Sequence, residues 1–322
     1  MNSSSRYVEA TAHPTMGIVL LGGLSDPINR IPLHGSAGIA YTIKNKDSVA
    51  RTRISFSDTK RWYKFNGKEI EESSRSPMSF IRKYEERLKT KYRTKYVNFE
   101  SENQDILSGS SDAGAAAIGK CMQYLLPDED PVAMENYLRM ISESVGRSLF
   151  GGLTITELIN HGTRTKQLLN HEELRDYEIT AFTFPHERRP SDDIHFNIKK
   201  LPEYPQRVMS ANSKLIELQK LAGKKDIEGI FELAHNDTDE YHSLVEKAGV
   251  KIITPEMRVL MKDVNMIRKN IWCSYIVTGG NNVFVASKNE DSEAISDKLQ
   301  RPDVRITKLI VAGQPKVTSS NI

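Results

Sequence analysis

Cysteine, long apolar runs and excess charge of either sign are all scarce in this sequence. Cys121 and Cys273 are the only two cysteines among 322 residues, which excludes a disulfide framework and a four-cysteine zinc site. The longest apolar stretch, 16–21, is far shorter than the ~20 residues of a membrane-spanning helix. The first residues lack the basic patch and apolar stretch of a signal peptide. These absences predict a cytoplasmic protein with no membrane partner.

Charge and histidine patterns exclude two further classes. The 45 lysines and arginines nearly balance the 42 aspartates and glutamates, for a net charge of +3, whereas nucleic-acid binders usually carry a larger basic excess. One run, 87–96, interleaves cations with tyrosines as single-strand binders do, but no second patch accompanies it, so we expect no nucleic-acid partner. His235 and His242 lie seven residues apart beside acidic residues, which we interpret as a solvated or salt-bridged helix face rather than a metal site.

The length and a composition of 38% apolar and 27% charged residues predict a globular α+β protein of about two domains. In the first half, strands are expected at 7–21, 38–43, 51–56, 61–65, 96–100 and 151–158, with a hairpin turn at Asn66-Gly67. Helices are expected there at 77–89, 113–126 and 132–145, the last with Pro131 at its start and Gly146 just past its end.

The second half predicts a split-βαβ sandwich. Its expected order is a strand at 178–184, a loop rich in proline and arginine, helices at 206–222, 226–248 and 255–270, strands at 273–277 and 283–286, a helix at 291–299 and a strand at 305–311. We place the domain boundary near Asp176, which gives an N-terminal domain of residues 1–176 and a C-terminal domain of residues 177–322.

A loop of small residues that opens into an alanine-rich helix is the most informative motif. It reads Ser108-Gly109-Ser110-Ser111-Asp112-Ala113. A helix N-terminus offers unpaired N–H groups and a partial positive charge, so the loop can bind phosphate, while its hydroxyls can bind phosphate or a metal ion. An ordinary N-cap is the alternative. The near-match to a P-loop at 114–121 is rejected, because it falls inside the predicted helix and has Cys121 where Ser or Thr is required.

A second motif places one acidic and one basic residue in a turn that is otherwise rich in small residues. In the segment 142–152, Glu143 and Arg147 stand between serines and glycines. Arginine suits bidentate binding of a carboxylate or phosphate, and the alternative is a helix C-cap with a structural ion pair. Arg188, in the expected loop, is a further cation for an anionic substrate. Glycine turns at 21–24 and 277–282 either approach a ligand or form plain hairpins.

Together these segments resemble the GHMP small-molecule kinases, and within them the diphosphomevalonate decarboxylase branch. The resemblance covers most of the chain and is anchored at 12–24, 108–117, 142–152 and 275–282, in the family's order and spacing. It implies a two-domain α+β GHMP kinase fold, with an N-terminal domain like the second domain of ribosomal protein S5 and a ferredoxin-like C-terminal domain.

The departures from the decarboxylases resemble the archaeal mevalonate 3-kinases. Leu20 stands where the decarboxylases have lysine, Thr278 stands where they have aspartate, and their Ser-Gly-Ser turn carries Glu143 instead of glycine. Losing the charged pair removes groups placed to manage the charge that moves during decarboxylation. A carboxylate at Glu143 would also repel a substrate phosphate by ~4 kcal/mol at 4 Å in a partly screened site. The favoured substrate is therefore unphosphorylated mevalonate.

The resemblance implies a role for each residue. ATP is expected over 108–113, namely Ser108, Gly109, Ser110, Ser111, Asp112 and Ala113, with Mg²⁺ held in part by Ser110. Arg147 and Glu143 are the expected catalytic residues. Arg147, with Arg188, would hold the mevalonate carboxylate, and Glu143 the terminal hydroxyl, while Leu20 and Thr278 would shape the wall around the methyl-bearing carbon. No obvious general base remains, and related enzymes imply a homodimer.

The expected reaction is phosphorylation of the tertiary 3-hydroxyl of mevalonate in archaeal isoprenoid biosynthesis, without decarboxylation. Three alternatives stay open. The first is a decarboxylase acting on a phosphorylated mevalonate, and the second is a kinase for another small hydroxy acid. The third is a non-enzymatic RNA-binding module, which predicts steeply salt-dependent RNA binding and no ATP turnover.

Overall fold

The computed structural model describes residues 6–70, 76–160, 162–186 and 191–322. The elements before residue 170 are β1 (Tyr7–Ala12), β2 (Thr15–Val19), β3 (Leu24–Asp26), β4 (Ile31–Pro32), β5 (Ser36–Ile43), β6 (Val49–Ser57), β7 (Tyr63–Phe65), β8 (Lys68–Glu69), α1 (Pro77–Tyr92), β9 (Tyr96–Gln104), α2 (Ser110–Leu125), α3 (Pro131–Leu138), α4 (Val145–Phe150), β10 (Leu153–Ile159) and β11 (Gly162–Leu169).

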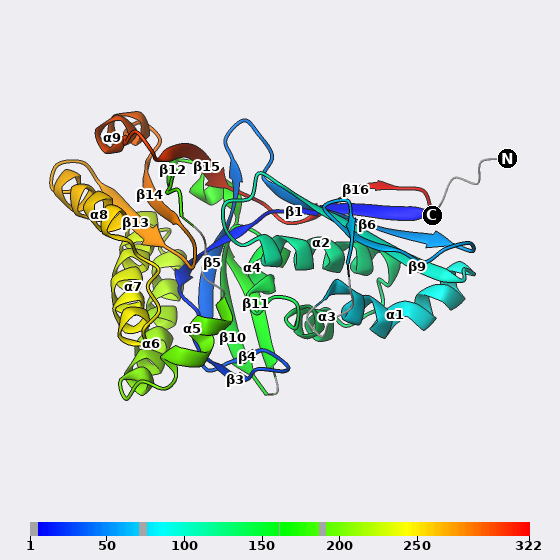
Figure 1. Cartoon of the computed structure of the whole chain (residues 1–322). Coiled ribbons are helices and arrows are strands. Elements are labelled where there is room, and N and C mark those ends of the chain that lie inside the picture. Colours follow the sequence, from blue (N-terminus) through cyan, green and yellow to red (C-terminus); the bar gives the residue numbers. More distant parts are fainter. Residues whose placement is uncertain (1–5, 71–75, 161, 187–190) are drawn as a thin grey trace.

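The elements after residue 170 begin with a short 3-10 helix, His171–Leu174. They continue with β12 (Tyr177–Thr183), α5 (Ser191–Ile198), α6 (Tyr204–Gly223), α7 (Ile227–Lys247), α8 (Pro255–Ile267), β13 (Cys273–Val277), β14 (Asn282–Lys288), α9 (Ser292–Leu299), β15 (Arg305–Val311) and β16 (Lys316–Ser320). Figure 1 shows the helices α6, α7 and α8 gathered at one end of the molecule and α1 and α2 under the sheet at the other.

One sheet combines strands of the N-terminal half with β16 from the end of the chain, which pairs with β1, and helices cover one of its faces. Its strand order is β16-β1-β6-β9-β7-β8. The alanines of α2 are buried, and their small side chains let the helix lie close to β1 and β6. The thiol of Cys121 on α2 is close enough to donate to the backbone carbonyl of Thr52 on β6 (3.5 Å). This close packing fixes where the N-terminus of α2 lies.

A second sheet runs through both halves in the order β11-β10-β5-β15-β12-β14-β13, with β2 also paired to β5. Its second half confirms the predicted split βαβ. Strands β12 and β13 are both antiparallel to β14, so they are parallel to each other with β14 between them. In the same way β14 and β15 are parallel with β12 between them. This interleaving of two βαβ units is the ferredoxin-like topology.

Several boundaries differ from the sequence-based expectations. The strand expected at 7–21 is two strands, β1 and β2, because the chain turns at His13-Pro14, where proline cannot donate to a ladder. The helix expected from residue 113 begins at Ser110. The Asn66-Gly67 turn is confirmed, with both residues at positive φ (47° and 75°) between β7 and β8. Helix α5 and strands β11 and β16 were not predicted.

The helix expected at 132–145 was wrong. Helix α3 ends at Leu138, and a separate short helix, α4, begins at Val145. The hydroxyls of Ser142 and Ser144 between them bind the carboxylate of Asp112, which holds this segment in a turn. Gly146 lies inside α4 and not past a helix end. It is packed so closely that an added Cβ would lie 1.9 Å from Thr165 Oγ1.

A glycine at the start of β10 gives a stability prediction. Gly152 has a φ of +63°, and an added Cβ would lie 2.2 Å from the carbonyl oxygen of Leu169. Gly249 has a φ of +83° with nothing within 4 Å, so it carries the conformational cost alone. We expect Gly152→Ala to lower the free energy of unfolding by about 3 kcal/mol or more and Gly249→Ala by about 1 kcal/mol, measured by urea denaturation. Equal losses would show that the contact with Leu169 is not rigid.

Candidate active site

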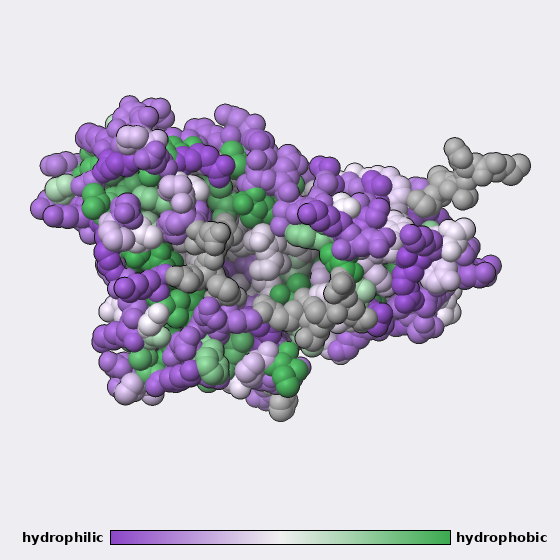
Figure 2. Space-filling view, in the orientation of Figure 1, coloured by the Kyte–Doolittle hydropathy of each residue, from purple (hydrophilic) through white to green (hydrophobic). Residues whose placement is uncertain are grey.

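The loop before α2, the start of α4, the end of β2 and the turn between β13 and β14 surround one cavity of about 190 Å³. In the space-filling view the surface is hollowed between the two halves of the molecule (Figure 2). The cavity is lined by the following residues: Thr15, Gly17, Leu20, Leu21, Ser108, Gly109, Ser111, Asp112, Ser142, Glu143, Ser144, Arg147, Ile194, His195, Tyr241, Thr278 and Gly279. The structure therefore brings together motifs that are far apart in the sequence.

The predicted phosphate-binding loop, residues 108–113 and called here the phosphate loop, is held in place before α2 begins. The hydroxyl of Tyr41 accepts from the backbone N–H of Ser108 (2.7 Å) and donates to its carbonyl oxygen (2.8 Å). Gly109 has a φ of +71°, and an added Cβ would lie 2.5 Å from the carbonyl oxygen of Thr15. Ala113 donates its N–H to Gly109, so this predicted phosphate-binding residue has no free N–H to offer. The donors of the helix end are those of Ser110, Ser111 and Asp112.

The carboxylate of Asp112 accepts hydrogen bonds from three hydroxyl groups on two neighbouring segments, β2 and the serine turn before α4. Its oxygens accept from Thr15 Oγ1 (2.5 Å), from Ser144 Oγ (2.8 and 3.0 Å) and from Ser142 Oγ. The side chain is buried at the positive end of α2, which favours its charge. Asp112 thus ties the serine turn to β2 and to the phosphate loop, a structural role that the sequence did not predict.

Arg147 is a buried cation that faces the cavity. Gly17 of β2 and Gly38 of β5 are paired in register, and together they leave the space in which this side chain lies. A Cβ at Gly38 would lie 2.5 Å from Arg147 Cδ. Within the described part of the chain, neither Nε nor Nη2 of Arg147 has a hydrogen-bond partner. Burial lowers the pKa of the guanidinium, because desolvation disfavours its charge more than Asp112 and Glu143 stabilise it.

Glu143 is bound on both carboxylate oxygens. Arg30 donates to Oε2 from Nε (2.9 Å) and Nη2 (2.8 Å), and the ring Nε2 of His195 is 2.9 Å from Oε1. Burial raises the pKa of Glu143, but the hydrogen bond from His195 and the charge of Arg30 outweigh it and hold the pKa well below its usual range. The repulsion of a substrate phosphate expected from the sequence assumed that Glu143 carries an uncompensated negative charge. That part was wrong, because Arg30, 113 residues away, neutralises it.

His195 has one defined tautomer at this position. Its Nδ1 accepts from the backbone N–H of Gly23 (3.1 Å), so Nε2 carries the proton that is donated to Glu143. His195 lies on α5, the helix that sequence reasoning missed. A histidine with no partner in sequence gives no signal of its own, and neither does Arg30.

Leu20 and Thr278 line the same cavity, as the resemblance implied. Both side chains are buried, and Thr278 Oγ1 lies 3.1 Å from Ser108 Oγ. The wall at these two positions is therefore neutral and in contact with the phosphate loop. Arg188, the remaining predicted substrate residue, lies outside the described residues.

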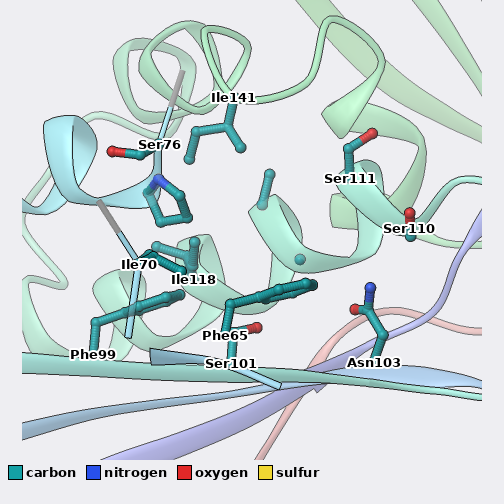
Figure 3. A pocket seen from close by; sticks show the side chains of 13 residues that line it. Phe65, Ile70, Ser76, Phe99, Ser101, Asn103, Ser110, Ser111, Ile118 and Ile141 are labelled. Carbon is teal, nitrogen blue, oxygen red and sulfur yellow. The ribbon is translucent and has the colours of Figure 1, made fainter. Parts of the chain in front are cut away.

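A second cavity of about 400 Å³ lies on the other side of the start of α2. Figure 3 shows Phe65 and Phe99 rising from the strands on its floor and Asn103 reaching toward Ser110. Aromatic faces beside an amide fit a planar base, and the N-terminus of α2 fits the phosphates. Ser111 lines both cavities, so the helix end lies between them.

Among the residues that the structure describes, no group of three or more His, Cys, Asp or Glu side chains could hold a metal ion. The donors near the helix end are the hydroxyls of Ser110 and Ser111 and the carboxylate of Asp112. This set fits a magnesium ion that enters with a nucleotide, because Mg²⁺ commonly uses few protein ligands together with substrate phosphates. In the same described residues, no helix is both long and apolar enough to cross a membrane.

Comparison with known proteins identifies the architecture. Residues 12–166 match the model of the diphosphomevalonate decarboxylase-like N-terminal domain, and residues 189–293 match that of the mevalonate-3-kinase C-terminal domain. The chain is thus built from two domains found in small-molecule enzymes of this type.

Two relatives and one solved structure show to which family the chain belongs. Mevalonate 3-kinase of Thermoplasma acidophilum is 44% identical over 290 residues, covering 90% of this chain and 91% of the relative. Mevalonate-3-kinase of Picrophilus torridus is 42% identical over 321 residues, covering 98% of each chain. The crystal structure of the T. acidophilum enzyme with mevalonate 3-phosphate and ADP has a TM-score of 0.92 at 40% identity, covering 99% of this chain and 100% of that one. The chain belongs to the mevalonate 3-kinase family.

The pairing of Glu143 predicts a pH-dependent loss of stability. Glu143→Gln leaves the buried guanidinium of Arg30 without its main partner, so we expect the free energy of unfolding to fall by about 3 kcal/mol at pH 7. Because the folded pKa of Glu143 is lowered, its contribution is present above the ordinary value of 4.5 and is lost as the pH falls below it. Urea denaturation of both proteins between pH 3 and pH 8 measures the difference.

The matched control is Glu86→Gln, which removes an exposed carboxylate paired with Lys89. We expect this variant to stay within about 0.5 kcal/mol of the wild type at every pH. A difference between wild type and Glu143→Gln that grows as the pH falls would contradict the assignment of a stabilising charge to Glu143.

Proposed function

We propose that this protein transfers the γ-phosphoryl group of ATP to the tertiary 3-hydroxyl of mevalonate and stops there, without decarboxylation. The observation that carries the proposal is the buried guanidinium of Arg147, whose Nε and Nη2 have no hydrogen-bond partner within the described residues. A desolvated cation at the wall of a small cavity needs an anion. The carboxylate of a small hydroxy acid supplies one and accepts two parallel hydrogen bonds from the guanidinium.

Glu143 supplies the second fixed point for the acceptor. Its charge is compensated by Arg30, so it serves as a hydrogen-bond acceptor for the terminal hydroxyl of mevalonate rather than as a free repelling charge. A phosphate in place of that hydroxyl would still meet a carboxylate without a proton to share. The site therefore favours the unphosphorylated acid. The reason is that an ionised carboxylate can accept a hydrogen bond from a hydroxyl but has no proton to donate to a phosphate.

The second cavity is the proposed place of the nucleoside of ATP. The phosphates would then run past Ser108–Asp112 toward the acceptor, and Ser111 lies where the two cavities meet. Ser110, with the phosphates, is the proposed protein ligand for Mg²⁺, which supplies charge neutralisation when bound. The T. acidophilum relative binds mevalonate 3-phosphate and ADP, which are the two products of this transfer.

The transfer relies on positioning. The 3-hydroxyl oxygen forms a bond to the γ-phosphorus, the bond to the oxygen shared with the β-phosphate breaks, and the hydroxyl proton is released. Phosphoryl transfer through a loose transition state needs alignment and charge neutralisation more than a strong base. Arg147 would orient the acceptor through its carboxylate, and the neutral wall of Leu20 and Thr278 would hold the methyl-bearing carbon.

The same wall disfavours the decarboxylase alternative. Decarboxylation must expel phosphate as carbon dioxide leaves, which moves negative charge across the site. The structure has a hydrocarbon and a neutral hydroxyl at Leu20 and Thr278, where the decarboxylases carry a lysine and an aspartate. A homodimer and a cytoplasmic location belong to the same proposal and rest on the resemblance to the family.

Phosphorus NMR tests the reaction directly. The protein is incubated with ATP, Mg²⁺ and mevalonate while carbon dioxide is monitored. We expect a stable phosphate ester on the tertiary carbon, stoichiometric ADP and no gas, because the site lacks the charges for the second step. Release of inorganic phosphate together with carbon dioxide would overturn the proposal in favour of a decarboxylase. The Arg147→Met variant should form ester at least 100-fold more slowly at subsaturating mevalonate.

A single substitution in α2 tests the nucleotide cavity. Gly114 lines this cavity, and an added Cβ meets nothing within 4 Å, so Gly114→Leu fills space without strain. We expect the KM for ATP to rise at least tenfold, while the Tm stays equal or rises, because leucine is favoured over glycine in a helix by about 0.8 kcal/mol. Gly223→Leu, at an equally open glycine in α6, is the control and should leave the KM unchanged. An unchanged KM for Gly114→Leu would place the nucleotide elsewhere.

A further inference from the structure

Residues 20–23, called here the Leu20 segment, run from the end of β2 as irregular backbone that is largely buried. Buried backbone N–H and C=O groups must find partners. The carbonyl of Gly23 accepts from the backbone N–H of Leu33 (3.3 Å), and side chains of α5, α6 and α7 supply further partners from residues more than 170 positions along the chain.

A buried ion pair holds Leu20 itself. Asp237 of α7 accepts from the N–H of Leu20 (2.7 Å), and Arg207 of α6 donates to the carbonyl of Leu20 (2.7 Å). The two side chains are fully buried and bind each other through two hydrogen bonds of 2.5 and 3.1 Å. Lys214 also binds Asp237 (3.0 Å) and Glu240 also binds Arg207 (3.1 Å), so the charges are compensated within one network. Arg207 and Asp237 therefore present a fixed donor and a fixed acceptor to the two peptide groups that flank Leu20.

Two tyrosines continue the same arrangement. Tyr241 of α7 donates to the carbonyl of Leu21 (3.0 Å), and Tyr204 of α6 donates to the carbonyl of Gly22. The glycine pair makes this approach possible, because a Cβ at Gly22 would lie 2.8 Å from Tyr241 Cε2 and one at Gly23 would lie 2.2 Å from the Tyr204 hydroxyl. The two glycines of the turn at 21–24 therefore make room for the two tyrosines, while Leu21 lines the cavity.

Helix α7 also holds the strand end next to Thr278, the second neutral residue of the cavity wall. His242 Nε2 donates to the carbonyl of Val277 (2.9 Å), and Thr238 Oγ1 accepts from the N–H of Val277 (3.4 Å). Val277 directly precedes Thr278. This helix face was expected to be solvated or salt-bridged. Asp237 is salt-bridged to Arg207, and both Asp237 and His242 are buried rather than solvated. Figure 1 shows α7 beside α6, and α7 packs against both β2 and β13.

We infer that α7, together with Arg207 and Tyr204 of α6, positions Leu20 relative to Thr278 and so sets the width of the acceptor cavity. This inference rests on the proposed function of that cavity. Arg207, Tyr204 and Asp237 do not line the cavity and act on the acceptor through Leu20, which makes them positioning residues. A loosened Leu20 segment would widen the wall and weaken binding of the small acid, while the nucleotide cavity, on the far side of α2, stays unchanged.

Tyr204→Phe is the mildest test, because it keeps the ring and removes one donor. We expect the KM for mevalonate to rise about fivefold to tenfold, since a buried carbonyl loses its partner, while the KM for ATP stays within about twofold. Tyr92→Phe is the matched control: it also removes a tyrosine hydroxyl that donates to a backbone carbonyl, that of Leu125 (3.0 Å), in the N-terminal half. The control should change neither KM by more than about twofold.

Amide hydrogen exchange gives a readout that does not depend on activity. We expect a peptide spanning 18–24 to exchange faster in Tyr204→Phe than in the wild type or in Tyr92→Phe. If the proposed function fails and mevalonate is not phosphorylated, this measurement still tests whether the Leu20 segment is held from α6.

Two results would overturn the inference. One is unchanged exchange of peptide 18–24 in Tyr204→Phe. The other is a faster exchange combined with an unchanged KM for mevalonate, or with equal rises of both KM values, since either would mean that the position of Leu20 does not control acceptor binding. Asp237→Asn keeps an acceptor for the N–H of Leu20 but weakens the ion pair, and it should raise the KM for mevalonate in the same selective way.

Discussion

A guanidinium enclosed by protein, with donors left for an anion, is the constraint on which the acceptor site depends. Arg147 can lie where it does only because Gly17 and Gly38 face each other across β2 and β5 and leave room for it. Keeping such a charge out of water costs free energy that a bound carboxylate can recover. The helix break after α3, the serine turn and the short helix α4 all serve to bring this residue to the cavity wall.

The other charges near the cavity are already compensated. Asp112 accepts hydrogen bonds from three hydroxyl groups, and Glu143 is bound by Arg30 and His195. The remaining wall, formed by Leu20 and Thr278, is neutral. Among the described residues that line the cavity, Arg147 is the one cation with donors left available, and such a cation beside a neutral wall suits an acceptor with one carboxylate and an alcohol. It does not supply the pair of opposite charges that expelling phosphate together with carbon dioxide would require.

The N-terminus of α2 separates the two cavities proposed for the acceptor and the nucleotide. The N-terminus of α2 lies between the small polar cavity and the larger apolar one, and Ser111 lines both. The alanine-rich packing of α2 against β1 and β6 fixes this end from the N-terminal half, while α6 and α7 fix the Leu20 wall from the C-terminal half. The proposed acceptor cavity is therefore built from both halves, because Arg147 and Glu143 come from the N-terminal half, whereas the residues that hold Leu20 come from the C-terminal half. The proposed nucleotide cavity is lined by the N-terminal half alone.

Local signals and ordered motifs were enough to predict the loop that opens into α2, the ferredoxin-like topology, the Asn66-Gly67 turn and the presence of Leu20 and Thr278 at one cavity. These depend on residue type at short spacing, or on a family pattern read along the chain. The sequence could not predict that Arg30 and His195 bind Glu143, that α4 breaks away from α3, or that Asp237 and Arg207 hold Leu20. Such contacts join residues 30 to more than 200 positions apart, and whether a charged side chain is solvated or buried is decided only when the elements pack. The sequence determined which groups are present, and the tertiary structure decided which of them stay available for a ligand.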